Sequence, residues 1–181
     1  VPFTAVLLID GSASMYGAKL AAARAGASSF VNGMHDLDEA KVMVFSDVIQ
    51  SSTPFSSSPE VLTAGFTGVV GLGGTAVNDH LFAALKMLEA RQGRRLVVLL
   101  SDGIDPHSAL HAAEVVEHAR RSQTMVYWIR MLQPAESIDE RDQPEMVSAW
   151  RMPEEYRDQR RYLQELVELS GGRMIPVRST A

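Results

Sequence analysis

Two short, continuous runs of apolar residues constrain the fold of this chain most strongly. They are Ala-Val-Leu-Leu-Ile at residues 5–9 and Leu-Val-Val-Leu-Leu at residues 96–100. A strand with one covered face alternates apolar and polar residues, whereas an unbroken apolar run is typical of a strand covered on both faces of a parallel sheet. We therefore expect both runs to be central strands of a sheet that has helices on each side.

Strands and helices alternate along most of the chain. Helical spacing of apolar residues starts at residue 18, and further helices are expected from residues 59, 78, 106 and 162, with Asn78 and Asp79 as cap candidates. Additional strands are expected at residues 42–46, 48–50, 125–129 and 173–177; the second of these is antiparallel, because only a short break precedes it. This inventory predicts a doubly wound, Rossmann-like α/β fold. It has a mostly parallel six-stranded sheet, one antiparallel edge strand and helices on both faces.

Length and composition narrow the possible functions. The chain has 181 residues, of which 46% are hydrophobic and 22% charged, and we expect a single domain spanning residues 1–181. Its net charge is −5 and its basic residues form no cluster, which disfavours nucleic acid as a partner. It contains no cysteine for a thiolate metal site, and its apolar runs are far shorter than the roughly 20 residues of a membrane span. The start at Val1, without an initiator methionine, indicates a piece of a larger protein.

Two aspartates follow the two predicted central strands. Asp10 ends the first apolar run, and Asp102 comes just after the second. In a sheet of order 3-2-1-4-5-6 these strands are neighbours, about 4.8 Å apart, and the crevice at their carboxyl ends is the usual ligand site. Neither segment contains a basic residue, so the repulsion between the carboxylates must be relieved by protonation, by solvation or by a cation.

Three hydroxyl groups are expected around the same crevice. Ser12 and Ser14 follow Asp10, and Thr75 ends a glycine-rich segment. A donor set made only of oxygen suits Mg²⁺, with Mn²⁺ or Ca²⁺ as alternatives, and disfavours Zn²⁺. Mg²⁺ takes six oxygens, so at least one position stays open for an anionic oxygen such as an Asp or Glu side chain of a protein partner. The candidate metal ligands are Asp10, Ser12, Ser14, Thr75 and Asp102.

These motifs together resemble a known site. Asp10-x-Ser12-x-Ser14, Thr75 after two glycines, and Asp102 followed by glycine are similar to the metal-ion-dependent adhesion site of von Willebrand factor type A domains, especially bacterial ones. The resemblance implies a Rossmann-like fold and metal-dependent protein binding in adhesion or assembly. It also implies that the three hydroxyls bind the ion directly or nearly so, and that the aspartates act directly or through water. An extracytoplasmic setting, periplasmic or secreted, is favoured by the resemblance, although cytoplasmic relatives exist.

The chain departs from that family in two places. Residues 133–161 form an apparent insertion between the fifth strand and the last helix; we interpret it as a determinant of partner specificity, with Trp150 as an apolar anchor. The chain also stops four residues after Val177, so we do not expect the family's C-terminal switch helix within it.

Other interpretations remain open at this point. Asp10 and Asp102-x-x-Asp105 are also similar to haloacid-dehalogenase-like phosphatases, which would make the chain a Mg²⁺-dependent phosphoryl hydrolase, but Ser12 stands where that chemistry needs an acid. A scaffold domain with a vestigial metal site is a third interpretation. His107 and His111 have the spacing of a helical zinc pair but lack the accompanying glutamate. We expect a binding module without catalytic residues.

Overall fold

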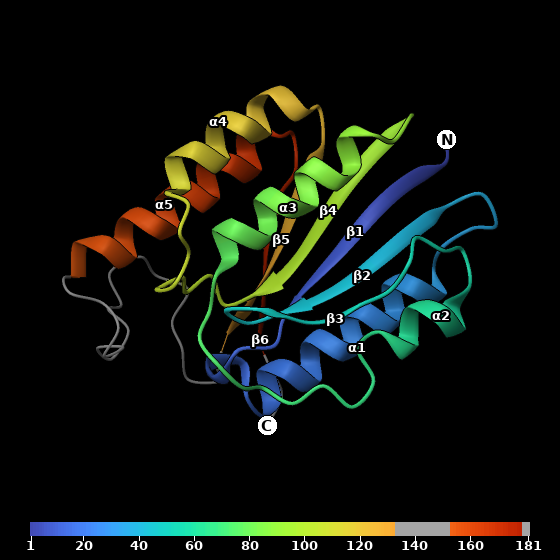
Figure 1. The fold of residues 1–181 in the computed structure, drawn as a ribbon, viewed down its shortest axis with the longest axis horizontal. Helices are drawn as coiled ribbons and strands as arrows, with labels where there is room; N and C mark the ends of the chain where they lie inside the picture. The colour runs from blue at the N-terminus through green and yellow to red at the C-terminus, as the bar shows by residue number, and fades with distance from the viewer. Residues whose placement is uncertain (133–152, 179–181) are drawn as a thin grey trace.

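The computed structural model describes residues 1–132 and 153–178, which build one six-stranded sheet in the order β3-β2-β1-β4-β5-β6 (Figure 1). Every neighbouring pair is parallel except β2 and β3. The predicted fold class, strand order and antiparallel edge strand are therefore confirmed. The strands are β1 Phe3–Asp10, β2 Glu39–Phe45, β3 Ile49–Ser52, β4 Arg94–Ser101, β5 Met125–Leu132 and β6 Met174–Arg178.

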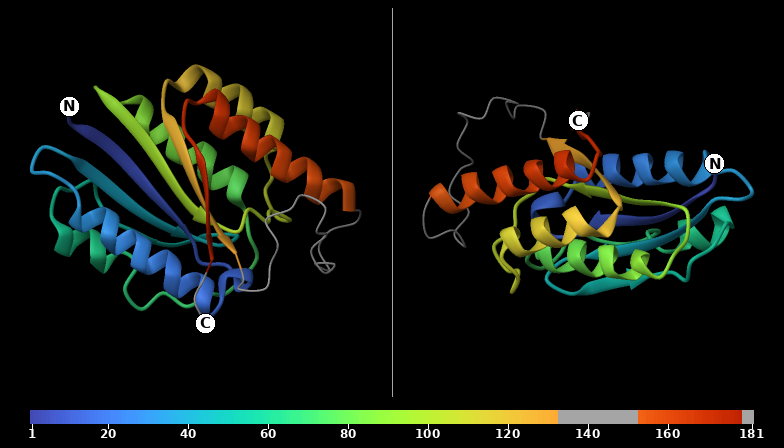
Figure 2. Two further views of the ribbon diagram at one scale, coloured as in Figure 1. Left: turned by 180° about the vertical axis from the view of Figure 1, so that it is seen from behind. Right: turned by 90° about the horizontal axis from the view of Figure 1, so that it is seen from above.

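Helices cover both faces of the sheet. One face packs against α1 and α2, and the opposite face packs against α3, α4 and α5 (Figures 1 and 2). No helix among residues 1–132 and 153–178 is long and apolar enough to cross a membrane. The helices are a 3-10 turn η1 Ala13–Met15, α1 Ala18–Asn32, α2 Pro59–Ala64, α3 Val77–Glu89, α4 Ala112–Ser122 and α5 Pro153–Leu169.

The unbroken apolar runs are buried on both sides, as expected. Along β1, Val6 and Leu8 join the core under α3, α4 and α5, while Leu7 and Ile9 join the core under α1 and α2. All four are at most 1% exposed. Each such side chain contributes about 1.5–3 kcal/mol relative to exposure, so the two central strands are firmly anchored and their carboxyl ends are placed with precision.

Three predicted element boundaries were wrong. The helix after β4 begins at Ala112 and not at residue 106, because side chains of other segments bind the intervening backbone. The N-cap of α3 is Ala76, which puts Asn78 and Asp79 inside the first turn. The last helix begins at Pro153, so residues 153–161 of the predicted insertion belong to α5. The rest of that segment, with Trp150, lies outside the described residues.

Candidate metal centre

The two aspartates lie side by side at the carboxyl edge of the sheet. Asp10 is the last residue of β1 and Asp102 follows β4, and these strands are paired in register with Ile9 opposite Leu100. Asp10 is fully buried and Asp102 is 5% exposed. The parallel strands in Figure 1 all run toward this edge, where α1 begins. The topology thus brings together two carboxyl groups that are far apart in the sequence.

The loop after β1 places two hydroxyls beside Asp10. The Ser12 N–H donates to Asp10 Oδ1 at 2.9 Å, and the Ser12 and Ser14 Oγ atoms are 3.1 Å apart. The Gly11 N–H donates to the Phe45 carbonyl at 2.7 Å, which ties the loop to the end of β2. In an octahedron with metal–oxygen distances of about 2.1 Å, adjacent ligand oxygens are about 3 Å apart. The spacing of the two serine oxygens therefore fits two neighbouring positions on such an ion.

Electrostatics at the site favour a cation. Burial, and then the nearby Asp102 carboxylate, raise the pKa of Asp10 from 3.8 to about 7, although hydrogen bonds from Ser101 and Ser12 act in the opposite direction. The Ser101 hydroxyl donates to Asp10 Oδ2 at 2.6 Å. The charged form of Asp10 is thus disfavoured in the metal-free protein, and a bound cation would favour it.

A lysine that the sequence argument missed also reaches the site. Lys19, the second residue of α1, donates from Nζ to Asp102 Oδ2 at 2.9 Å, and both side chains are buried. The expectation that no basic residue relieves the paired acids was wrong, because the lysine comes from the helix and not from either strand end. The available signal was helical spacing: Lys19, Ala23 and Ala27 follow one another at four-residue intervals, and all are buried.

Thr75 is brought toward the loop after β1 by backbone contacts. The Ala13 N–H donates to the Gly73 carbonyl at 3.1 Å, so the glycine-rich segment lies against that loop. The Thr75 N–H donates to His107 Nδ1 at 3.3 Å, its carbonyl accepts the His107 N–H at 3.1 Å, and the residue is 3% exposed. These contacts place the Thr75 backbone, while the role of its hydroxyl as a ligand stays a prediction.

The contact of His107 with Thr75 is a second feature that sequence reasoning missed. The His107 ring supports the Thr75 backbone and lies so close to Gly74 that a Cβ there would be 2.6 Å from His107 Nδ1. His111 instead occupies the N-cap position of α4. The two histidines therefore have different neighbours, which gives no support to a zinc pair. No local spacing reveals the His107 contact, since it joins loops 32 positions apart.

The backbone after β4 is held by a close contact with the core. Gly103 has a φ of +83°, and a Cβ on it would lie 2.3 Å from Trp128 Cζ2. Trp128 is fully buried, and its Nε1–H donates to the Ser101 carbonyl at 3.0 Å. The Asp102 backbone is therefore positioned by a glycine that permits the turn and by an indole that fixes the strand end.

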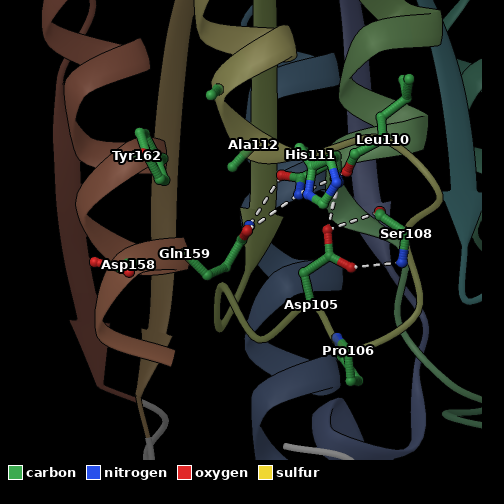
Figure 3. Close-up of a pocket in the computed structure, with 11 residues that line it drawn as sticks. Asp105, Pro106, Ser108, Leu110, His111, Ala112, Asp158, Gln159 and Tyr162 are labelled. Carbon is green, nitrogen blue, oxygen red and sulfur yellow. Dashed lines mark hydrogen bonds between the residues drawn. The ribbon is translucent and has the colours of Figure 1, made fainter. Parts of the chain in front are cut away.

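Asp105 has a structural role beside a separate cavity of about 500 Å³ (Figure 3). Its Oδ2 accepts the Asn78 N–H at 2.7 Å and the Ser108 hydroxyl at 2.8 Å. Asn78 also exchanges two side-chain hydrogen bonds with Gln159 of α5. Asp105 thus caps the first turn of α3 from a remote loop, and its burial raises the pKa of its carboxyl.

The five predicted ligands form a chemically consistent donor set for a hard dication. Their side chains supply two carboxylates and three hydroxyls, and the serine pair has the spacing that adjacent ligands need. Within the described residues there is no group of three or more His, Asp or Glu side chains that could hold a metal. The Lys19 ammonium is the feature that opposes a bound cation.

Comparisons with known proteins agree with this geometry at the level of the fold. Residues 5–104 match the family model described as von Willebrand factor type A domain. An aerotolerance-related membrane protein from Bacteroides fragilis NCTC 9343, with multiple mutations to serines, is 19% identical at a TM-score of 0.66, covering 96% of this chain and 90% of that one. The conserved hypothetical protein BatB from Bacteroides thetaiotaomicron is 17% identical at a TM-score of 0.69, covering 98% of this chain and 91% of that one.

A more distant neighbour has the same fold within a longer chain. A von Willebrand factor type A structure from Catenulispora acidiphila is 14% identical at a TM-score of 0.60, covering 90% of this chain and 42% of that one. None of the curated proteins compared with the chain gives a significant match.

Proposed function

The chain belongs to the von Willebrand factor type A domain family, and from that premise we propose that residues 1–181 are one domain that captures a protein partner through a Mg²⁺-type ion. Domains of this family are commonly protein-binding modules and typically non-catalytic. The proposed ligands are Asp10, Ser12, Ser14, Thr75 and Asp102, and the proposed partner group is an Asp or Glu side chain.

The observation that carries the proposal is the serine pair beside two buried acids. Asp10 and Asp102 supply negative charge at the crevice, and Ser12 and Ser14 present oxygens 3.1 Å apart. When bound, Mg²⁺ supplies an electrophilic position that accepts a carboxylate oxygen. The side chains of Asp10, Ser12, Ser14, Thr75 and Asp102 would hold the ion through their oxygen atoms, and the partner carboxylate would complete its coordination.

The surface next to the site supports a protein as the partner. Tyr16, Val70 and Leu72 are 68%, 53% and 62% exposed. Their segments touch, because a Cβ on Gly71 would lie 3.0 Å from the Tyr16 Cα, and the Leu72 N–H donates to the Gly11 carbonyl at 2.9 Å. Exposed apolar side chains beside a polar site are typical of a protein interface.

A peptide-display library tests the proposal even though the natural partner is unidentified. We expect peptides selected on the immobilised protein in Mg²⁺ to share one Asp or Glu. Replacing that residue by its amide should weaken binding at least tenfold, and EDTA should release the peptide. Ser12→Ala should weaken Mg²⁺-dependent binding by a similar factor, because it removes one ligand oxygen while leaving the fold intact. Affinity measured by fluorescence anisotropy provides the readout.

Ser57→Ala is the matched control, since Ser57 is an exposed serine outside the site. It should leave both peptide affinity and thermal unfolding unchanged. Peptide binding that persists unchanged in EDTA would contradict metal-dependent capture. Mg²⁺-dependent turnover of a generic phosphate ester, lost in Asp10→Asn, would favour the phosphoryl hydrolase instead.

A metal-free scaffold is the second candidate function, and the Lys19–Asp102 ion pair is the observation that favours it. The ammonium already neutralises one of the two acids, so the fold does not depend on a metal for charge balance. Titration calorimetry separates the two candidates: a scaffold gives no heat and no thermal stabilisation with Mg²⁺, whereas a capture module gives both.

A further inference from the structure

Lys19 occupies an unfavourable position for a lysine. It is 6% exposed, and it lies in the first turn of α1, where the positive end of the helix dipole repels a cation. Burying an ammonium group costs free energy unless a partner compensates for its lost hydration. The contact with Asp102 Oδ2 at 2.9 Å provides that compensation. Asp102 therefore holds the Lys19 side chain in the candidate metal centre, whereas the helix terminus repels its charge.

The charge of the centre depends on this side chain. If Asp10 is counted as ionised, which is the form that a bound cation favours, the charges of Asp10, Asp102 and Lys19 sum to −1 before the ion is added. A dication raises the sum to +1, and one carboxylate from a partner then returns it to zero. Without Lys19 the net charge would be −2 in the metal-free state, 0 with the dication and −1 with the dication and the partner carboxylate. The lysine thus opposes the ion in the partner-free centre and favours the addition of a single acidic side chain.

We propose that Lys19 is a built-in counter-ion of the centre: it neutralises Asp102 when no metal is bound, and it lowers the affinity of the partner-free centre for a dication. The inference rests on the proposed function and adds a determinant of metal affinity to it. Its two halves make separate predictions, one for the metal-free protein and one for the titration with Mg²⁺.

Titration calorimetry of the full chain with Mg²⁺ alone tests the second half. Lys19→Met should tighten the dissociation constant for Mg²⁺ at least tenfold, because the competing positive charge is gone. Lys19→Gln should act in the same direction and serves as a second variant, since its amide can still donate to Asp102. Lys86→Met is the control, because Lys86 is an exposed lysine on α3 that pairs with Glu89.

Chemical unfolding in EDTA tests the first half. Lys19→Met should lower the unfolding midpoint of the metal-free protein, since two buried acids then face each other without a counter-ion. Adding Asp102→Asn to that variant should recover part of the loss, and saturating Mg²⁺ should raise the midpoint more in Lys19→Met than in the wild type.

The outcomes separate this inference from the proposed function. Mg²⁺ affinity that is unchanged or weaker in both Lys19 variants, with a wild type that binds, overturns the counter-ion role and leaves metal-dependent capture standing. If the wild type does not bind Mg²⁺ but the Lys19→Met variant does, the counter-ion role is supported and metal-dependent capture is overturned. Absence of binding in all variants overturns both.

Discussion

Asp10 is a proposed ligand whose pKa is strongly raised by its surroundings. Its carboxyl is fully buried, it accepts hydrogen bonds from the Ser12 N–H and the Ser101 hydroxyl, and its pKa is raised to about 7. Because the folded state holds this proton up to a higher pH than the unfolded state, the folded protein binds more protons between pH 3.8 and about 7. Stability from this group is therefore present at low pH and is lost as the pH rises through that window.

This linkage predicts a pH dependence that metal removes. Between pH 5 and pH 8 the free energy of unfolding of the metal-free protein should fall by about 3 kcal/mol through Asp10, at about 1.4 kcal/mol per pKa unit. Saturating Mg²⁺ should reduce the slope, since the ion favours the charged carboxylate in the folded state. Urea unfolding at several pH values, with and without Mg²⁺, measures this slope. An Asp10→Asn variant with the same slope as the wild type would show that another group is responsible.

At the scale of single residues, sequence reasoning found what is local and missed what is remote. Asp10, Ser12 and Ser14 lie within five positions, and their mutual contacts follow from that spacing. Lys19 and His107 reach the site through tertiary contacts with Asp102 and Thr75, 83 and 32 positions away. Such contacts depend on helix orientation and loop path, which periodicity does not specify.

At the scale of elements, the ends of helices are decided by partners from elsewhere in the chain. The first turn of α3 is capped by Asp105 and by the Ser108 hydroxyl, which accepts the Asp79 N–H at 3.1 Å. In return, Asp79 accepts the N–H groups of Ala109 and Leu110. This exchange explains why α4 starts later than its sequence suggests, since backbone groups near residue 110 are already bound by α3.

The end of β4 provides a prediction with a matched control. Gly103 and Gly93 have nearly the same φ, +83° and +81°, but a Cβ on Gly103 would meet Trp128 at 2.3 Å, whereas nothing lies within 4 Å of one on Gly93. Gly93→Ala should cost about 1 kcal/mol, from backbone strain alone. Gly103→Ala should cost at least about 2 kcal/mol more, because a buried indole must also move. Denaturant titration measures both, and equal losses would contradict the packing account.

At the scale of the whole molecule, the order of the sheet was predictable because two strands lack any polar face. The runs at residues 5–9 and 96–100 had to be central strands. The alternation of strands and helices along the chain then predicted the order 3-2-1-4-5-6, which the structure has. That order makes β1 and β4 neighbours, so the place of the candidate site at their carboxyl ends followed from topology. The net charge within the crevice did not follow, because it depends on Lys19 of α1.

Crystals grown in saturating Mn²⁺ and measured by anomalous scattering test directly whether the crevice is a metal centre with an open position. We predict one peak, about 2.1–2.2 Å from the Ser12 and Ser14 hydroxyl oxygens and near Asp10, Thr75 and Asp102, with at least one ligand from solvent or from an acidic side chain of a neighbouring molecule. Mn²⁺ should also shift the Lys19 ammonium away from Asp102. The opposite result is a crevice without a peak at saturating Mn²⁺ and with the Lys19–Asp102 contact intact, which would contradict metal-dependent capture by this chain.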